Sequence, residues 1–367
     1  MRRGRVSTVV VKVGTSSLTD ERGVIDRSII EKVAEEIATA RTAGHQVVLV
    51  TSGAIAAGLP VLGMDATNRP TDAVTLQAAS SVGQPQLIRA WSDALAACGS
   101  TTGQILLAPH NFGDRRQYLH ARSTLARLLE LDVTPIVNEN DAVTDDEIRY
   151  GDNDRIAALV AHLVDAEVLV LLTDTQGVLT ADPRVDPEAS LIEEIVDLDA
   201  QLESVGAGAG SVRGSGGMAS KLMAARIAAW SAVRTVIAST DRPHVLADAI
   251  NGIEGVGSNV AARTTSLPAR KLWIAFATAP VATIIVDDGA RRALEKGGTS
   301  LLAAGVVSAS GTFERRDAVE LADPHGEVFA KGVTRISGED LDAARNGANG
   351  SARPVVVHVD DLVVLAR

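Results

Sequence analysis

The sequence lacks a second cysteine, since Cys98 is the only one among 367 residues. A lone cysteine excludes an intramolecular disulfide and a zinc site built on several cysteines, and it fits a reducing cytoplasm. The sequence also lacks any apolar run near the ~20 residues that a membrane helix needs. Its basic start, MRRGRVSTVVVKVG, has no small-residue cleavage site, so we expect a first strand there rather than a signal peptide.

Positive charge is scarce as well. The chain has 35 lysines and arginines against 46 aspartates and glutamates, a net charge of −11. This balance argues against a general affinity for nucleic acid or anionic membranes. A small anionic substrate would therefore depend on a few well-placed lysines. The length exceeds one typical core, so we expect two domains.

The first two-thirds of the chain alternate short β-branched runs with amphipathic stretches. This alternation predicts an α/β fold, a mostly parallel open sheet with helices on both faces. Ligands of such sheets bind beyond the carboxyl ends of the strands. The expected strands are 6–13, 46–51, 102–107, 133–137, 168–172 and 235–237, and the expected helices are 27–41, 71–97 with a break near Pro85, 117–131, 154–164 and 218–232.

The pattern changes after about residue 263. The stretch ARKLWIAF, at 269–276, looks like a connecting strand. Short strand-like runs then alternate with glycine turns, and one helix is expected at 290–296. We therefore expect a first domain over 1–262, a linker over 263–279 and a small, mainly β domain over 280–367.

Two glycine-rich turns are candidates for binding phosphate. VVVKVGTSSL places Lys12 and Gly14 at the end of the first strand, where backbone N–H groups can approach phosphate oxygens and the ammonium group adds charge. GAGAGSVRGSGGMASK, at 206–221, leads into a helix with Lys221 in its first turn. Its spacing is not that of a Walker A loop. Two interpretations remain: an anion-binding loop at a helix N-terminus and a flexible loop. Thr173 and Asp174 follow a strand and suit nucleotide recognition or a helix cap.

Acidic side chains crowd the stretch VNENDAVTDDEIRYGDND, which contains no histidine and no EF-hand spacing. A hard cation, the ammonium group of a substrate and solvent are alternative partners. The carboxylates at 145–147 fit a solvated loop. The other polar residues adjoin a strand or a helix, and could hold an ammonium group and orient lysines: Asn138, Asp141, Asp152, Asn153 and Asp154.

Phosphoryl transfer would use these residues in a defined way. Two lysines beside one phosphate repel each other, and a carboxylate between them, for which Asp154 is the candidate, relieves the repulsion. None of the seven histidines lies in these motifs. A carboxylate acceptor is already ionised at pH 7 and needs no base. A kinase that forms an acyl phosphate is therefore consistent with the residues present, although an aspartate could also serve as a base.

Six segments together resemble the glutamate 5-kinases of the amino acid kinase family, in order over about residues 5–260. They are VVVKVGTSSL, LVTSGAIAAG, PIVNENDAV, GDNDRIAALVA, LLTDTQGVLTADPR and GSGGMASKLMAA. TSGAIAAG, NENDAV and GDND distinguish this group from carbamate, acetylglutamate, aspartate and uridylate kinases. The tail, over about 279–358, is similar to a PUA domain.

The resemblance implies phosphoryl transfer from ATP to the side-chain carboxylate of L-glutamate, with Mg²⁺ bridging the phosphates. The product, L-glutamyl 5-phosphate, opens proline biosynthesis, and proline is implied as a feedback inhibitor. Lys12 and Lys221 would stabilise the transferred group, and Asp154 would hold both. The residues implied to bind glutamate are Ser52, Asn138, Asp141, Asp152 and Asn153. Those implied to bind ATP are Lys12, Gly14, Thr173, Asp174, Ser215, Gly216, Gly217, Met218, Ala219, Ser220 and Lys221. No side chain is assigned to the metal.

Two other functions stay as alternatives. PUA domains often bind RNA, but residues 280–367 hold 10 lysines and arginines against 13 aspartates and glutamates, so we expect no nucleic-acid partner. A related kinase could act on acetylglutamate or carbamate, and NENDAV and GDND argue against that. We expect a cytoplasmic homo-oligomer that binds L-glutamate and ATP.

Overall fold

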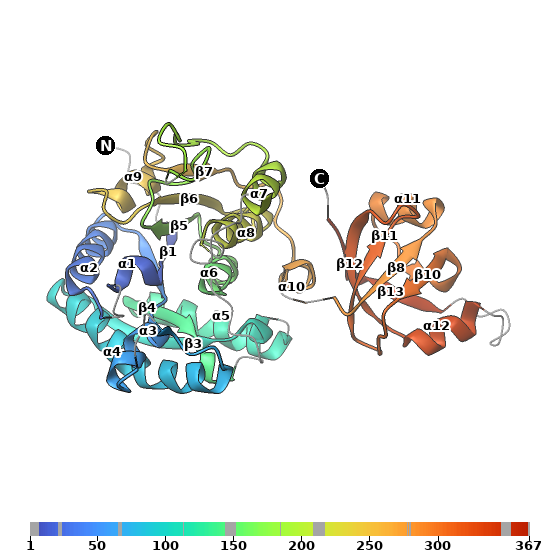
Figure 1. Ribbon diagram of the computed structural model, residues 1–367, viewed down its shortest axis with the longest axis horizontal. Coiled ribbons are helices and arrows are strands. Elements are labelled where there is room, and N and C mark those ends of the chain that lie inside the picture. Colours follow the sequence, from blue (N-terminus) through green and yellow to red (C-terminus); the bar gives the residue numbers. More distant parts are fainter. Residues whose placement is uncertain are drawn as a thin grey trace. The chain divides into compact units, whose positions relative to one another are not determined.

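The chain divides into two compact units, Met1–Ser266 and Leu267–Arg367 (Figure 1). The computed structural model describes residues 7–20, 24–64, 68–112, 114–143, 152–183, 185–207, 217–276, 278, 280–345 and 354–365. Within these residues, no helix is both long enough and apolar enough to span a membrane. Each unit has its own sheet.

The first unit is built on a seven-stranded sheet in the order β3-β4-β2-β1-β5-β6-β7. Its strands are parallel except for β7, which pairs antiparallel with β6. This arrangement confirms the expected mostly parallel sheet, and only β7 lacks a predicted counterpart. The strands are β1 Thr8–Val13, β2 Gln46–Thr51, β3 Thr101–Leu107, β4 Val133–Glu139, β5 Val168–Thr173, β6 Arg234–Ser239 and β7 Ser258–Val260.

Helices cover both faces of this sheet (Figure 1). On one face, α2 (Arg27–Thr42), α4 (Ala73–Ala97) and α9 (Val245–Asn251) pack on Val9, Val11 and Val13 of β1. Side chains alternate along a strand, so Val10 and Lys12 face the opposite side. That side holds α5 (Arg115–Glu130), α6 (Asp152–Leu163) and α8 (Gly217–Trp230). The shorter helices are α1 (Thr15–Leu18), α3 (Ala54–Val61) and α7 (Leu198–Ala207), with 3₁₀ turns η2 (Pro109–Phe112) and η3 (Asp141–Val143).

The break expected near Pro85 does not occur, because α4 runs continuously from Ala73 to Ala97. Proline removes one backbone hydrogen bond and costs about 3 kcal/mol inside a helix. Pro85 lies on the exposed side, where water can solvate the carbonyl that it leaves unpaired. Buried side chains on both sides of it, including Leu76 and Trp91, hold the helix against the sheet.

Two glycines let α3 and α4 touch backbone to backbone. A Cβ atom added at Gly58 of α3 would lie 1.8 Å from the carbonyl oxygen of Ala79. One added at Gly83 of α4 would lie 1.8 Å from that of Ala54. No side-chain rotation can relieve either contact, since the clashing atom belongs to the backbone. The first turn of α3, which follows Ser52, is thereby fixed against the middle of α4.

The second unit is mainly β, as expected. Its six-stranded sheet has the order β10-β8-β11-β12-β13-β9, and only β8 and β11 pair in parallel. The strands are β8 Ala282–Val286, β9 Leu301–Leu302, β10 Val306–Ser310, β11 Ala318–Ala322, β12 Val328–Thr334 and β13 Val355–Val364. The helical elements are α10 Ala269–Phe276, α11 Asp288–Lys296, α12 Gly338–Arg345 and the 3₁₀ turn η4 Ala303–Gly305.

The prediction of a connecting strand at 269–276 is wrong, because these residues form helix α10. A short apolar run cannot be assigned to a strand or a helix by its periodicity alone. Tertiary contacts decide here: Leu272 and Ile274 are buried, and Arg270 forms an ion pair with Asp361 of β13 at 2.6 Å.

The substitution Gly83→Ala tests the contact between α3 and α4. Overpacking a close-packed site costs typically 1–3 kcal/mol, which exceeds the gain of about 1 kcal/mol in helix propensity. We expect a lower free energy of unfolding in urea. Ala78→Ser is the matched control, because it adds one heavy atom at an exposed position of the same helix. Equal stability of the two variants would show that the helices separate without strain.

Candidate active site

The carboxylate of Asp154, near the start of α6, lies between two lysines that come from distant parts of the chain. Its Oδ1 lies 2.6 Å from Lys12 Nζ of β1, and its Oδ2 lies 3.3 Å from Lys221 Nζ of α8. Ser220 Oγ donates to the same Oδ2 at 2.6 Å. The exposed fractions are 3% for Lys12, 1% for Asp154 and 6% for Lys221, so the three charges are almost fully removed from bulk water.

Burial and charge act against each other in this cluster. Burial lowers the pKa of Lys12, Asp154 raises it, and Lys221 lowers it further, with a net lowering. Burial raises the pKa of Asp154, but the two ammonium groups and the hydrogen bonds from Lys12 and Ser220 lower it below its usual range. Asp154 is therefore ionised at neutral pH, and its carboxylate attracts both ammonium groups.

The start of α8 completes this side of the site. Lys221 Nζ also donates to the carbonyl oxygen of Gly217 at 3.3 Å, which holds the lysine against the first turn of its own helix. Gly14, which follows β1, lies beside Lys12: a Cβ atom there would be in ordinary van der Waals contact with Lys12 Nζ, at 3.5 Å. Gly217, Met218 and Ala219 begin α8, one residue before the start expected at 218, whereas Ser215 and Gly216 lie outside the described residues.

Thr173 and Asp174 lie at the carboxyl end of β5. Thr173 Oγ1 donates to Asp174 Oδ1 at 3.0 Å, and the Thr173 carbonyl accepts from Thr240 N at 2.8 Å. Thr240 Oγ1 lies 3.0 Å from this carbonyl and 3.2 Å from Ser17 Oγ. Residues 174–183 contain no helix, so the pair does not cap one.

A second group of polar side chains lies at the ends of β2 and β4. Asn138 Oδ1 and Asn153 Oδ1 both accept from the backbone N–H of Glu139, at 2.9 and 3.2 Å. Both amide oxygens are thus engaged, and the NH₂ groups are the donors that a ligand could use. Ser52 follows β2, and its backbone N–H donates to the carbonyl of Val13 at 3.2 Å, beside the end of β1.

Asp141 is the carboxylate of this second group. Its side chain is buried, and its Oδ2 accepts from Ser80 Oγ of α4 at 2.5 Å. Burial raises the pKa of Asp141, although Ser80 and the positive charge of Arg69 lower it. Asp152 begins α6, but its side chain lies outside the described residues, as do residues 145–147.

Sequence reasoning missed Ser80 and Thr240. Ser80 is a polar residue on the apolar face of a helix, between the buried Leu76 and Leu87, and this position was a usable signal. Thr240 directly follows β6, where the strand-end rule also applied.

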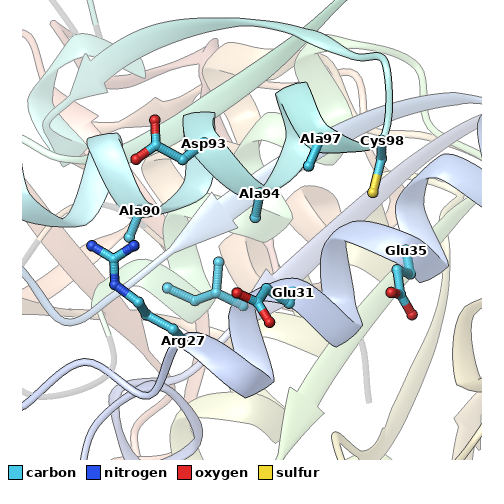
Figure 2. A pocket seen from close by; sticks show the side chains of 9 residues that line it. Arg27, Glu31, Glu35, Ala90, Asp93, Ala94, Ala97 and Cys98 are labelled. Carbon is cyan, nitrogen blue, oxygen red and sulfur yellow. The ribbon is translucent and has the colours of Figure 1, made fainter.

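A groove of about 280 Å³ lies elsewhere, between α2 and α4. Figure 2 shows Arg27, Glu31 and Glu35 of α2 and Asp93 and Cys98 of the α4 region along it. None of the predicted site residues lines it. The buried charges converge instead at the strand ends.

The described residues include no group of three or more histidine, cysteine, aspartate or glutamate side chains that could hold a metal ion. Asp154, the buried carboxylate nearest the lysines, is already occupied by both of them.

Comparison with protein-family models gives two matches. The model of the amino acid kinase family covers residues 7–239, and that of the PUA domain covers residues 282–352. A solved carbamate kinase from Giardia lamblia, bound to AMP-PNP, shares the fold with a TM-score of 0.52 at 19% identity, over 70% of this chain and 99% of that one. The chain belongs to the amino acid kinase family.

Curated relatives narrow this assignment. Glutamate 5-kinases from Nitrosomonas eutropha and Chromobacterium violaceum are each 43% identical to the chain, and one from Pseudomonas entomophila is 42% identical. Each match covers 97% of both chains. Within the amino acid kinases, the chain is a member of the glutamate 5-kinase family.

The substitution Asp154→Asn tests the buried charge cluster. Removing one partner of a buried ion pair costs about 3–5 kcal/mol, because the ammonium groups of Lys12 and Lys221 stay buried without a counter-charge. Burial already lowers the pKa of Lys12, and in the folded variant this pKa should fall still further below that in the unfolded chain. The unfolded chain then binds more protons, so the variant's stability should rise with pH towards the unfolded lysine pKa.

Urea unfolding at pH 7 and pH 9.5 measures both effects. Ser220→Ala is the control, since it removes only the neutral hydroxyl that donates to Asp154 and should cost about 1 kcal/mol at either pH. An Asp154→Asn protein as stable as the wild type at pH 7 would contradict the assigned electrostatics.

Proposed function

We propose that this protein catalyses the ATP-dependent phosphorylation of the side-chain carboxylate of L-glutamate, the first step of proline biosynthesis. The observation that carries the proposal is the pair of buried lysines held by Asp154 at the carboxyl ends of parallel strands. Ligands of such sheets bind there. The names of the curated relatives supply the acceptor, which the geometry alone does not define.

The chemistry follows from the charges. An oxygen of the glutamate side chain attacks the γ-phosphorus of ATP, the bond from this phosphorus to the β,γ-bridging oxygen breaks, and ADP leaves with the bond's electrons. The attacking carboxylate is ionised at neutral pH, so no proton has to be removed. Lys12 and Lys221 stabilise the charge on the phosphoryl oxygens, and Asp154 keeps both ammonium groups in place.

Each lysine can stabilise the charge that develops on the phosphoryl group by several kcal/mol. At about 4 Å and an effective dielectric constant near 20, one lysine interacts with a developing charge by about 4 kcal/mol. That corresponds to roughly a thousandfold in rate. Asp154 also reduces the repulsion between the two lysines, which would otherwise separate them.

The nucleotide would lie against the ends of β1 and β5 and the start of α8. We assign Gly14, Thr173 and Asp174 to it, together with the segment from Ser215 to Lys221. Magnesium would enter with ATP as part of the substrate and would supply positive charge at its phosphates. The support for these assignments is that the described members of the set lie at the carboxyl ends of neighbouring strands or begin α8.

The amino-acid end of glutamate would lie at the second group of polar side chains. We assign the ammonium group to Asp141, whose buried carboxylate accepts a hydrogen bond from Ser80. The remaining contacts are assigned to Ser52, Asn138, Asp152 and Asn153. The amide NH₂ groups of Asn138 and Asn153 suit a carboxylate, because their oxygens are engaged by Glu139 N–H.

We propose that residues 1–262 perform the reaction, that 263–279 link the domains, and that 280–367 form a PUA-like domain with a structural or regulatory role. Proline as feedback inhibitor, a homo-oligomeric state and a cytoplasmic location belong to the same proposal.

Release of ADP with magnesium-ATP tests the acceptor. The panel is L-glutamate, N-acetylglutamate, bicarbonate with ammonia, and UMP, each with and without proline. We expect turnover on L-glutamate alone, suppressed by proline. Lys221→Ala is the control: it should lower kcat about a thousandfold while the KM for glutamate changes little. Turnover on another acceptor would refute the proposed substrate.

The pH dependence of the KM for glutamate tests Asp141. Because burial raises the pKa of Asp141, the carboxylate becomes protonated at a higher pH than usual and loses its attraction for the ammonium group. The KM should therefore rise as the pH falls from 8 to 5. Asp141→Asn should raise the KM roughly 10- to 100-fold at pH 8 and remove most of this rise. An unchanged KM in the variant would take Asp141 out of the glutamate site.

A further inference from the structure

Helix α4 contacts both halves of the proposed acceptor site. Its Gly83 backbone lies against the first turn of α3, which begins two residues after Ser52. Its Ser80 Oγ donates to Asp141 Oδ2 at 2.5 Å, and its Gln84 Nε2 donates to the carbonyl oxygen of Glu139 at 3.2 Å. Ser80 and Gln84 are four residues apart and therefore share one face of the helix. This face borders the segment that carries Asp141.

The contact made by Ser80 is unusual for a serine inside a helix. Such a serine often donates to the carbonyl four residues before it, as Ser81 does to Gln77 at 2.9 Å. Ser80 is 2% exposed and directs its single proton away from its helix, to Asp141. A buried hydroxyl that binds an ionised carboxylate makes a charge-assisted hydrogen bond, roughly twice as strong as a neutral one.

We propose that Ser80 is a positioning residue for the acceptor site: it holds Oδ2 of Asp141 so that Oδ1 faces the ammonium group of the amino-acid substrate. The inference rests on the proposed function, because that function assigns Asp141 to the substrate. It adds a residue outside the set that the sequence motifs contain. Gln84 supports the same segment through the Glu139 carbonyl.

Electrostatics give Ser80 a second effect. Burial raises the pKa of Asp141, and Ser80 and Arg69 oppose this rise. Further charged groups on neighbouring elements are Glu139, buried at the end of β4, and Asp154 and Arg155 of α6, of which Asp154 is paired with two lysines. The loss of the Ser80 hydroxyl should therefore shift Asp141 further towards its protonated form.

The experiment compares Ser80→Ala with two matched variants. Ser81→Ala removes the neighbouring hydroxyl, which is exposed and bonds only within α4 among the contacts described. Ser80→Thr keeps a hydroxyl at the buried position. For each protein we would measure KM and kcat for glutamate and KM for ATP from pH 5 to 9. The Asp141 carboxyl would be titrated by ¹³C NMR without substrate, and assigned by its loss in Asp141→Asn.

The proposal expects Ser80→Ala to raise the KM for glutamate about tenfold at pH 7, with little change in kcat or in the KM for ATP. The acid limb of kcat/KM and the NMR pKa of Asp141 should both move to higher pH. Ser81→Ala should behave as the wild type, and Ser80→Thr should recover most of the lost affinity.

Three results would overturn it. An unchanged KM for glutamate and an unchanged NMR pKa of Asp141 in Ser80→Ala would show that the hydrogen bond does not affect substrate binding. Equal losses in kcat and in both KM values would indicate general disruption of the fold. An NMR pKa that moves as expected in a protein that does not turn over glutamate would refute the proposed function, and with it the substrate role of Ser80, while leaving the hydrogen bond itself established.

Discussion

The contact of one buried carboxylate with two buried ammonium groups is the constraint on which the rest of the site depends. Lys12 is supplied by β1, Asp154 by α6 and Lys221 by α8, so the cluster exists only when the sheet and the helices on one of its faces have assembled. None of the three charges could be buried alone without a large desolvation penalty. Folding and preparation of the site are therefore the same event for these residues.

The site has two sides that the sheet order brings together. Strand β1 lies between β2 and β5. The strands β2, β3 and β4 lie on one side of it in the sheet, and β5, β6 and β7 lie on the other. The side assigned to ATP lies near β5 and α8, and the side assigned to glutamate lies near β2 and β4. Lys12, at the end of β1, stands where these sides meet, which suits a residue that contacts the group passing between two substrates.

Much of the framework could be predicted from the sequence, because its signals are local. The β-branched runs predicted six strands of the first unit. The position of Lys12 inside an otherwise apolar strand indicated that this lysine has a functional role. Local reasoning failed where tertiary contacts decide: Pro85 stays inside α4, and 269–276 is a helix anchored by Arg270. Ser80 was missed because its partner lies 61 residues away in the sequence, and no local pattern relates them.

The contact between Gly58 and Gly83 has a consequence for how this site can evolve. A contact made by side chains can be adjusted in small steps, since a methyl group can be added, removed or moved. A contact between two backbones has no such intermediate forms, because the smallest possible change already places a carbon atom 1.8 Å from an oxygen. Mutations therefore cannot change the distance between α3 and α4 in small steps. New acceptor preferences would have to arise at positions such as Ser80 and Gln84, where side chains with graded sizes and polarities are available.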